Sequence, residues 1–247
     1  MVRFKFATCG KSDALSFAVA KLQQLSWEEA QTGADILLLP VPSFNDSGSV
    51  RGGGDLPFAL QQIKPGAWVA GGNLQHPALK GRKILDLLQD PVYVAKNAQI
   101  TAHCAVRLAV EKLPCILLGC SCLVIGWGRI GKCLATLLRN MGAHVTVTAR
   151  KDSDLAILQA MGYEADLLSN LSPDKYRVIF NTVPAPVLSA DSCLGNALKI
   201  DLASTPGIQG ADVIHARGLP GIMAPESSGA LIAHRLYTLL NEQEVLL

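Results

Sequence analysis

One stretch of this chain constrains its fold more than any other, because it combines four local signals in a fixed order. An apolar run at residues 122–125 leads directly into a glycine pattern at 126–131, which reads GWGRIG. A helical spacing of apolar residues then continues to Gly142, and a second β-rich run follows at 145–148. A strand, a GxGxxG turn, a helix and a second strand are typical of a dinucleotide-binding Rossmann domain.

The three glycines of this turn have separate physical roles. Gly126 permits the tight turn after the strand, Gly128 lets the backbone approach a pyrophosphate, and Gly131 lets the helix lie close to the sheet. Free N–H groups and the positive end of the helix dipole then face the phosphates. The sequence therefore predicts a cofactor site formed by the whole turn, which consists of Gly126, Trp127, Gly128, Arg129, Ile130 and Gly131.

The residues after the second strand indicate which dinucleotide is bound. An acidic residue there would accept a hydrogen bond from the ribose 2′-hydroxyl of NAD, whereas this chain has Arg150 and Lys151. Because a guanidinium group matches phosphate oxygens, this pair favours NADP(H) over NAD(H). Alternatively, Asp152 or Asp154 binds the ribose. Asp152 and Ser153 are also candidate N-caps for the helix that follows them.

The composition is that of a compact globular protein, with 49% hydrophobic and 17% charged residues. A net charge of +2 gives no strong attraction to nucleic acid or to an anionic membrane. No apolar stretch is long enough to span a bilayer, and residues 1–6 lack the features of a secretion signal. We therefore expect a cytoplasmic protein.

The seven cysteines are an odd number and lie mostly in apolar runs, so we expect buried thiols rather than disulfides. They are Cys9, Cys104, Cys115, Cys120, Cys122, Cys133 and Cys193. Cys115, Cys120 and Cys122 are close in sequence, but no CxxC pair or nearby histidine completes a zinc site. The sequence therefore predicts no metal site.

The chain divides into two predicted domains of the α/β class. Residues 1–95 form a smaller domain that we expect to be flavodoxin-like, with buried strands such as 36–39. Residues 96–225 form the Rossmann domain, a doubly wound parallel sheet, and a helix at 97–113 connects the two domains. The final helix, at 226–247, can pack back on the first domain. This is the two-domain plan of dehydrogenases, with a cleft expected between the domains.

Strand ends supply further candidate residues, because ligands of open α/β sheets bind at the carboxyl ends of strands. We expect the nicotinamide carboxamide to bind backbone groups and hydroxyls after three strands of the Rossmann domain. The candidates there are Asn181, Thr182, Val183, Pro184, Ser204 and Gly221. In the first domain, Arg51, Gly52 and Gly53 belong either to a ligand loop or to a plain connection.

Four segments resemble the family of dipicolinate synthase A subunits, the NAD(P)-binding subunits of an enzyme from spore-forming bacteria. They are 118–131, with the glycine turn; 142–150, which ends in Ala-Arg; 200–207, a DLAS-x-PG motif; and 218–225, a GLPG-I-x-AP motif. The last two are much more specific than the glycine turn, which many dehydrogenases share. The chain departs from the family at Ile100 and His103, where the family has proline and glutamate, and at Glu226, where it usually has lysine.

The resemblance implies an NAD(P)-dependent oxidation of dihydrodipicolinate, or of its hydroxytetrahydro precursor, to dipicolinate. NADP is the preferred cofactor and NAD the alternative. Arg51 and the two glycines after it are then candidates to bind the substrate carboxylates. Asn97, Thr101 and His103 are candidates for the opposite wall, with His103 as the catalytic base. An oligomeric assembly with a flavoprotein-like B subunit is implied as well.

Two other functions are consistent with the sequence. One is a different two-domain oxidoreductase, although a 2-hydroxyacid dehydrogenase would need an Arg…Glu…His set and a shikimate-type dehydrogenase a Lys…Asp pair, neither of which is evident here. The other is a non-catalytic subunit that binds NADP(H) and docks on a partner. The replaced residues of the connector helix favour this second alternative.

Overall fold

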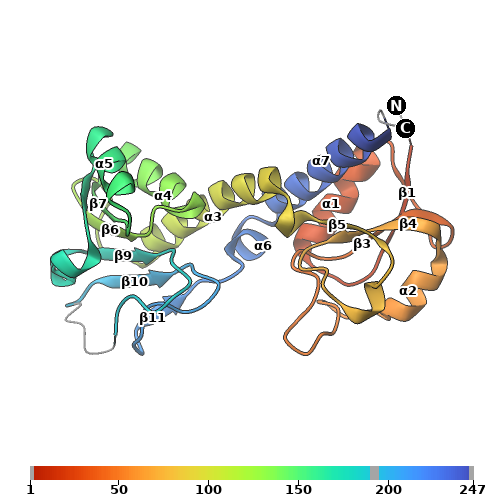
Figure 1. Cartoon of the computed structure of the whole chain (residues 1–247), viewed down its shortest axis with the longest axis horizontal. Helices are drawn as coiled ribbons and strands as arrows, with labels where there is room; N and C mark the ends of the chain where they lie inside the picture. Colours follow the sequence, from red (N-terminus) through yellow and green to blue (C-terminus); the bar gives the residue numbers. More distant parts are fainter. Residues whose placement is uncertain (1–2, 190–194, 245–247) are drawn as a thin grey trace. The chain divides into compact units, whose positions relative to one another are not determined.

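The computed structural model describes residues 3–189 and 195–244, which form two compact units (Figure 1). Unit 1 comprises Met1–Asn97 together with Pro220–Leu247, and unit 2 comprises Ala98–Leu219. Cys193 and the last three residues of the predicted final helix lie outside the described residues. Of the helices in the described ranges, none is both long and apolar enough to cross a lipid bilayer.

Unit 1 is built on a five-stranded parallel sheet with the strand order β2-β1-β3-β4-β5. The strands are β1 (Lys5–Thr8), β2 (Glu28–Glu29), β3 (Ala34–Leu38), β4 (Ile63–Gly71) and β5 (Lys83–Asp86). This is the strand order of the flavodoxin-like fold. The predicted flavodoxin-like domain is therefore confirmed.

Helices and short 3-10 helices complete the described part of unit 1. They are α1 (Asp13–Gln24), α2 (Leu56–Gln62), η1 (Pro77–Leu79), η2 (Leu87–Gln89), α6 (Leu219–Met223) and α7 (Pro225–Glu244). Ser12 caps α1, because its hydroxyl accepts a hydrogen bond from the N–H of Leu15 (3.1 Å). α7 runs beside α1 (Figure 1), and a Cβ on Gly229 would lie 2.5 Å from the carbonyl oxygen of Ala14. The absence of a side chain at residue 229 therefore lets the two helices approach closely.

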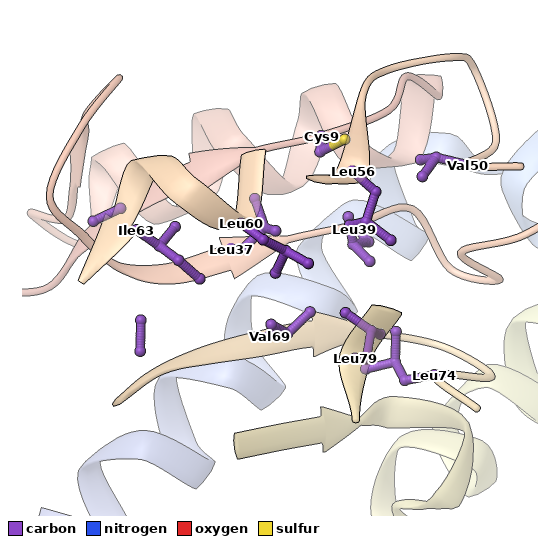
Figure 2. Close-up of a cluster of buried hydrophobic side chains, with 12 residues drawn as sticks. Cys9, Leu37, Leu39, Val50, Leu56, Leu60, Ile63, Val69, Leu74 and Leu79 are labelled. Carbon is purple, nitrogen blue, oxygen red and sulfur yellow. The ribbon is translucent and has the colours of Figure 1, made fainter. Parts of the chain in front are cut away.

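A hydrophobic core lies between α2 and the strands β3 and β4 (Figure 2). Leu56 and Leu60 of α2 pack in one cluster with Leu37 and Val69 of the sheet. Cys9, directly after β1, belongs to the same cluster. Because burial of each such aliphatic side chain contributes about 1.5–3 kcal/mol, the segment that follows β1 is held firmly by the core.

Unit 2 contains a six-stranded parallel sheet with the order β11-β10-β9-β6-β7-β8. Its strands are β6 (Ser121–Ile125), β7 (His144–Thr148), β8 (Glu164–Asp166), β9 (Val178–Asn181), β10 (Leu198–Asp201) and β11 (Val213–His215). Counted within the unit, this is the order 3-2-1-4-5-6 of a Rossmann domain. The predicted Rossmann sheet is confirmed.

α3 (Pro91–Lys112) begins in unit 1 and continues into unit 2. The other helices of unit 2 are α4 (Arg129–Asn140), α5 (Asp152–Ala160), η3 (Leu168–Asn170) and η4 (Pro173–Lys175). α3 begins at Pro91 and not at residue 97 as predicted. The reason is local, because the Asp90 carboxylate accepts a hydrogen bond from the N–H of Tyr93 (2.8 Å), and proline suits a first helical turn.

The start of α5 also differs from the prediction. The helix begins at Asp152, and its N-cap is Lys151, which makes no side-chain capping bond. Asp152 and Ser153 were therefore wrong as predicted N-caps. Asp152 and Asp154 instead lie in the first turn, where their negative charges interact favourably with the helix dipole.

Candidate functional site

The turn between β6 and α4 contains three glycines with different surroundings. Gly126 has a φ of 102°, a left-handed conformation that residues with side chains rarely adopt. A Cβ on Gly131 would lie 2.1 Å from the carbonyl oxygen of Gly126, so the close approach requires glycine. A Cβ on Gly128 would meet nothing within 4 Å. The turn is therefore tightly packed at both ends and open in its middle.

The N-terminus of α4 presents unused hydrogen-bond donors. Its N-cap is Gly128, which has no capping side chain, and the first intrahelical bond runs from the N–H of Lys132 to the Gly128 carbonyl (3.0 Å). Within the described part of the chain, the N–H groups of Arg129, Ile130 and Gly131 bond to no acceptor. Such donors, at the positive end of a helix dipole, bind phosphate oxygens. The site thus fits the diphosphate of a dinucleotide.

This turn lies beside the segment that follows β9. β6 and β9 are neighbours, and the chain leaves them toward opposite edges of the sheet, which makes their ends the topological switch point. Thr182 donates its hydroxyl hydrogen to the carbonyl of Ile125 (2.9 Å). A Cβ on Gly126 would lie 2.7 Å from the same hydroxyl oxygen. The structure therefore brings together the predicted residues Gly126 and Thr182.

A buried carboxylate fixes the two loops that follow β9 and β10. Asp201, only 1% exposed, accepts hydrogen bonds at Oδ1 from Asn181 Nδ2 (2.9 Å) and the N–H of Ala203 (3.0 Å). Its Oδ2 accepts from the N–H groups of Gly207 (2.7 Å) and Ile208 (3.0 Å). We call these five residues the Asp201 cluster. Because four donors satisfy the buried charge, the DLAS-x-PG motif has a structural explanation.

Asn181 is fully buried, and its amide bonds within the protein. Besides Asp201, its Nδ2 donates to the Val183 carbonyl (3.0 Å), and its Oδ1 accepts from the Val183 N–H (2.9 Å). A Cβ on Gly207 would lie 2.4 Å from Asn181 Nδ2, which accounts for the glycine of the motif. Asn181 therefore shapes the exposed loop at Pro184, and its side chain points into the protein rather than toward a ligand.

Trp127, in the middle of the glycine turn, packs against residues of its own unit. Its ring meets the ring of Tyr163 edge-on, with a centroid separation of 5.8 Å. The ammonium group of Lys132 lies 5.7 Å from the Trp127 ring centroid, and the guanidinium of Arg139 lies 4.1 Å from that of Tyr163. This alternation of cations and rings fixes the turn on α4 and gives Trp127 a structural role.

Arg150 and Lys151 directly follow β7. Both are exposed, and neither forms an ion pair with any other residue in the described ranges. Exposed cations of this kind can bind phosphate oxygens.

Two other predicted cofactor residues differ in their placement. Ser204 is exposed in the loop after β10, next to the Asp201 cluster. Gly221 lies in α6 and falls in unit 1, whereas all the other predicted cofactor residues fall in unit 2.

The predicted substrate loop borders a cavity of about 470 Å³ in unit 1. Gly52 and Gly53 line this cavity together with residues 8–11 on one side. Arg51 does not line it, and its Nε instead donates to the carbonyl of Phe44 (2.9 Å). A volume of this size lies in the range of about 300–1,000 Å³ that is usual for ligand pockets.

α3 does not bring its three predicted catalytic residues together. Asn97 and Thr101 are four residues apart and share one side of the helix, whereas His103 lies about 200° around the axis from Thr101. Thr101 is buried and Asn97 half-buried, but His103 is exposed. Asn97 and Thr101 therefore form a pair that excludes His103.

Thiol chemistry is not evident at either site. Among the described residues, no group of three or more His, Cys, Asp or Glu side chains is placed to hold a metal ion. Burial, and after it the nearby Asp55 carboxylate, raises the pKa of the Cys9 thiol. Burial likewise raises the pKa of the Cys122 thiol. Both cysteines therefore stay protonated near neutral pH and act as core residues.

Three residues at these sites were not predicted. Lys11 lies just beyond the carboxyl end of β1, a position that the rule on strand ends would have indicated. Asp201 ends β10 inside the DLAS-x-PG motif, but the sequence does not show which donors it accepts from. Phe58 reaches the cavity from α2, and no sequence pattern marks it.

The sequence is similar to that of a curated protein, the A subunit of dipicolinate synthase from Bacillus subtilis (strain 168). The two are 31% identical over 175 residues, which cover 65% of this chain and 59% of that protein. The alignment thus spans less than two thirds of the relative's length. No family model matches the chain.

Solved structures show the same fold. The A subunit of dipicolinate synthase from Bacillus halodurans has a TM-score of 0.83 at 24% identity, with 97% of this chain and 99% of that chain covered. The corresponding dipicolinate synthase structure from Bacillus subtilis has a TM-score of 0.82 at 22% identity, with coverage of 100% and 99%. The apo-structure of D-lactate dehydrogenase from Escherichia coli is more distant, with a TM-score of 0.59 at 14% identity and 97% coverage of each chain. The predicted resemblance to dipicolinate synthase A subunits is confirmed, and the fold is dehydrogenase-like.

Proposed function

We propose that this chain, a sequence relative of the A subunit of dipicolinate synthase, is an NADP(H)-dependent oxidoreductase that converts dihydrodipicolinate, or its hydroxytetrahydro precursor, to dipicolinate. The observation that carries the proposal is the open N-terminus of α4 facing loops that the Asp201 cluster holds in place. The first offers donors for a diphosphate. The second is built from the motif that resembles this family most specifically.

At the cofactor end, the N–H groups of Arg129, Ile130 and Gly131 would hold the diphosphate. Arg150 and Lys151 would bind the 2′-phosphate of NADP(H), with NAD(H) as the weaker ligand. The backbone of the loop at 182–184, which Asn181 fixes, offers partners for the nicotinamide carboxamide. NADP⁺ supplies the acceptor for the hydride that the substrate loses.

At the substrate end, the protein has to position the ring and accept a proton, since aromatisation of the product supplies the driving force. The loop with Gly52 and Gly53 would bind carboxylate oxygens. Arg51, which the sequence suggested for the same role, lies outside the cavity lining and donates through Nε to the Phe44 carbonyl. Asn97 and Thr101 would contact the substrate from their shared side of α3. His103 is proposed as the proton acceptor, acting separately from that pair.

The name of the relative, which is an A subunit, supports a further part of the proposal. We propose that the chain works in the cytosol with a flavoprotein-like B subunit, in an oligomeric assembly.

One observation favours a second candidate function, a non-catalytic subunit that binds NADP(H) and docks on a partner. His103 is exposed and lies on the opposite side of α3 from Thr101, so these two residues do not form an acid–base pair on this helix. In this case the cofactor would bind, but dihydrodipicolinate would not be oxidised.

The test is to follow the absorbance of the reduced nicotinamide with dihydrodipicolinate and either NADP⁺ or NAD⁺, with and without the B subunit. The proposal predicts reduction that depends on the substrate and is faster with NADP⁺. Cofactor binding without reduction, even with the B subunit present, would instead establish the non-catalytic function. Gly128→Ala serves as the matched negative control, because a Cβ at this position would enter the open middle of the turn and meets no protein atom within 4 Å.

A further inference from the structure

We propose that the cavity of unit 1 is a binding site for a small planar carboxylate, with Lys11 as its cationic anchor and Phe58 as the surface that takes the flat ring. This inference deepens the proposed function, on which it rests for the choice of test ligand. It assigns the carboxylate to Lys11 instead of Arg51, whose guanidinium is tied to the Phe44 carbonyl outside the cavity.

The cavity lies where ligands of parallel α/β sheets usually bind. It is lined by residues 8–11, which end and follow β1, and by residues 52–55 with Phe58 and Ala59, which follow β3. β1 and β3 are neighbours in the sheet, and the chain leaves β1 toward β2 and β3 toward β4. The cavity therefore lies at the topological switch point of the flavodoxin-like order, where ligands of such sheets bind.

The two segments that line the cavity contact each other through their backbones and leave space for a ligand. The N–H of Lys11 donates to the Arg51 carbonyl (3.1 Å), and a Cβ on Gly52 would lie 2.1 Å from the Lys11 carbonyl oxygen. A Cβ on Gly53 would meet nothing within 4 Å. In the described ranges, the N–H groups of Gly52 and Gly54 bond to no acceptor. The glycines thus leave backbone donors and open space instead of side chains.

The charged side chains of the lining favour an anionic ligand held by Lys11. Lys11 is exposed at the cavity and forms no ion pair with any residue that the structure describes. The one acidic group of the lining, Asp55, caps α2, because its Oδ1 accepts a hydrogen bond from the N–H of Phe58 (2.9 Å). An anion in the cavity would be attracted by Lys11 and repelled by Asp55, so substitutions of the two residues should act in opposite directions.

The aromatic ring of Phe58 indicates the shape of the ligand. Phe58 lines the cavity and is 59% exposed, so part of its ring is accessible to a ligand there. A flat unsaturated ring would cover this face, whereas a puckered ring would touch it only in part. Part of the cavity wall belongs to the hydrophobic core, since Cys9 lines the cavity and is also a member of the core cluster with Leu56 (Figure 2). The site therefore favours a planar ring that bears a carboxylate.

The test is titration calorimetry of the full chain, without nucleotide and in metal-free buffer. The probes are pyridine-2,6-dicarboxylate, benzene-1,3-dicarboxylate and cyclohexane-1,3-dicarboxylate. We expect both planar dicarboxylates to bind at least about tenfold more tightly than the cyclohexane compound. Equal affinity for all three would overturn the planar-ring assignment, and no binding of any would overturn the site.

Matched variants separate the anchor from a change of fold. Lys11→Ala should weaken binding of the planar dicarboxylates at least about tenfold, whereas Lys80→Ala, at an exposed lysine elsewhere in unit 1, should leave it unchanged. Asp55→Asn should strengthen binding severalfold, because asparagine caps a helix as well as aspartate but carries no charge. An unchanged affinity in Lys11→Ala, or weaker binding in Asp55→Asn with α2 intact by circular dichroism, would contradict the anchor.

This experiment can fail independently of the proposed function. If NADPH binds and dihydrodipicolinate is oxidised while Lys11→Ala has no effect on either the calorimetry or the KM, the cavity is not the substrate site and the enzyme assignment stands. If the planar dicarboxylates bind at Lys11 but no turnover occurs with the B subunit, the site stands and the enzyme assignment fails.

Discussion

Asn181 Nδ2 donates a hydrogen bond of 2.9 Å to Asp201 Oδ1, and both side chains are buried. The bond joins the carboxyl ends of β9 and β10, two neighbouring strands of the Rossmann sheet. Through its two bonds to Val183, Asn181 passes this constraint to the loop beside the glycine turn. The second half of the candidate cofactor site is therefore set by one buried carboxylate.

Asp201→Asn should destabilise unit 2. An asparagine supplies one acceptor oxygen in place of two and adds an NH₂ group among four donors. Because each unsatisfied buried polar group costs about 1–3 kcal/mol, we expect the free energy of unfolding to fall by roughly 2–4 kcal/mol. Urea denaturation measures this change, with the exposed Asp46→Asn as control. A stability equal to that of the control would show that the cluster is not needed for the fold.

Two glycine variants should separate folding from cofactor binding. Gly131→Ala places a Cβ 2.1 Å from the Gly126 carbonyl oxygen, and we expect it to lower stability by about 1–3 kcal/mol. Gly128→Ala meets no protein atom, so stability should hold while the dissociation constant of NADPH rises at least about tenfold. Thermal unfolding and NADPH titration measure the two effects. Unchanged NADPH affinity in Gly128→Ala would exclude this turn as the diphosphate site.

Arg150→Asp should reverse the cofactor preference. The substitution removes the cation that is proposed to bind the 2′-phosphate and supplies a carboxylate for the 2′-hydroxyl of NAD. We expect the ratio of NADPH to NADH affinity to fall by at least about 100-fold, which corresponds to about 2.8 kcal/mol. Arg177→Asp, an exposed charge reversal in the same unit, is the control. If Arg150→Asp binds both cofactors as the native chain does, the phosphate assignment is wrong.

His103→Gln tests the proposed proton acceptor. Loss of a general base lowers turnover by about 10²–10⁴-fold, and we expect a fall in kcat of this size with unchanged NADPH affinity. Because His103 is exposed on α3, the substitution should not alter stability. Steady-state kinetics with the B subunit present provide the measurement. Unaltered kcat would remove His103 from the mechanism and leave Asn97 and Thr101 as the remaining candidates on this helix.

The ion pair between Asp90 and Arg235 predicts a pH dependence of stability in unit 1. Arg235 donates to both carboxylate oxygens of Asp90 (2.5 and 2.9 Å), and these hydrogen bonds lower the pKa of Asp90. A depressed carboxyl pKa stabilises the fold above the unfolded value of about 3.9, and this contribution is lost as pH falls through the lower folded value. The stability difference between the native chain and Asp90→Asn should therefore be constant above about pH 5 and shrink as the pH falls below that value. A difference that is independent of pH would refute this role of the pair.

Both sheets could be predicted from the sequence because their signals are local. The buried run that ends β3 and the strand, turn and helix around Gly126 each depend on neighbouring residues in the chain. Helix starts were less predictable. Whether Lys151 or Asp152 is the N-cap of α5 depends on the backbone geometry, and the local sequence allows either residue in that position.

The sites were only partly predictable, because their contacts join distant segments. The Asn181 side chain donates a hydrogen bond to Asp201, which is 20 residues away in the chain, so the sequence alone does not reveal this contact. Lys11 and Gly52 meet across the β1–β3 switch point, which becomes visible only once the strand order is known. On α3, the grouping of His103 with Thr101 overlooked helical periodicity, which places residues two apart on opposite sides.

The central claim is that the N-terminus of α4 holds a diphosphate and that Arg150 selects the phosphorylated cofactor. Its most direct test is a calorimetric titration of the native full chain with NADPH and, under identical conditions, with NADH. We expect saturable binding of both nucleotides at one site per chain, with NADPH at least about tenfold tighter than NADH. Absence of binding by either nucleotide, or tighter binding of NADH, would contradict it.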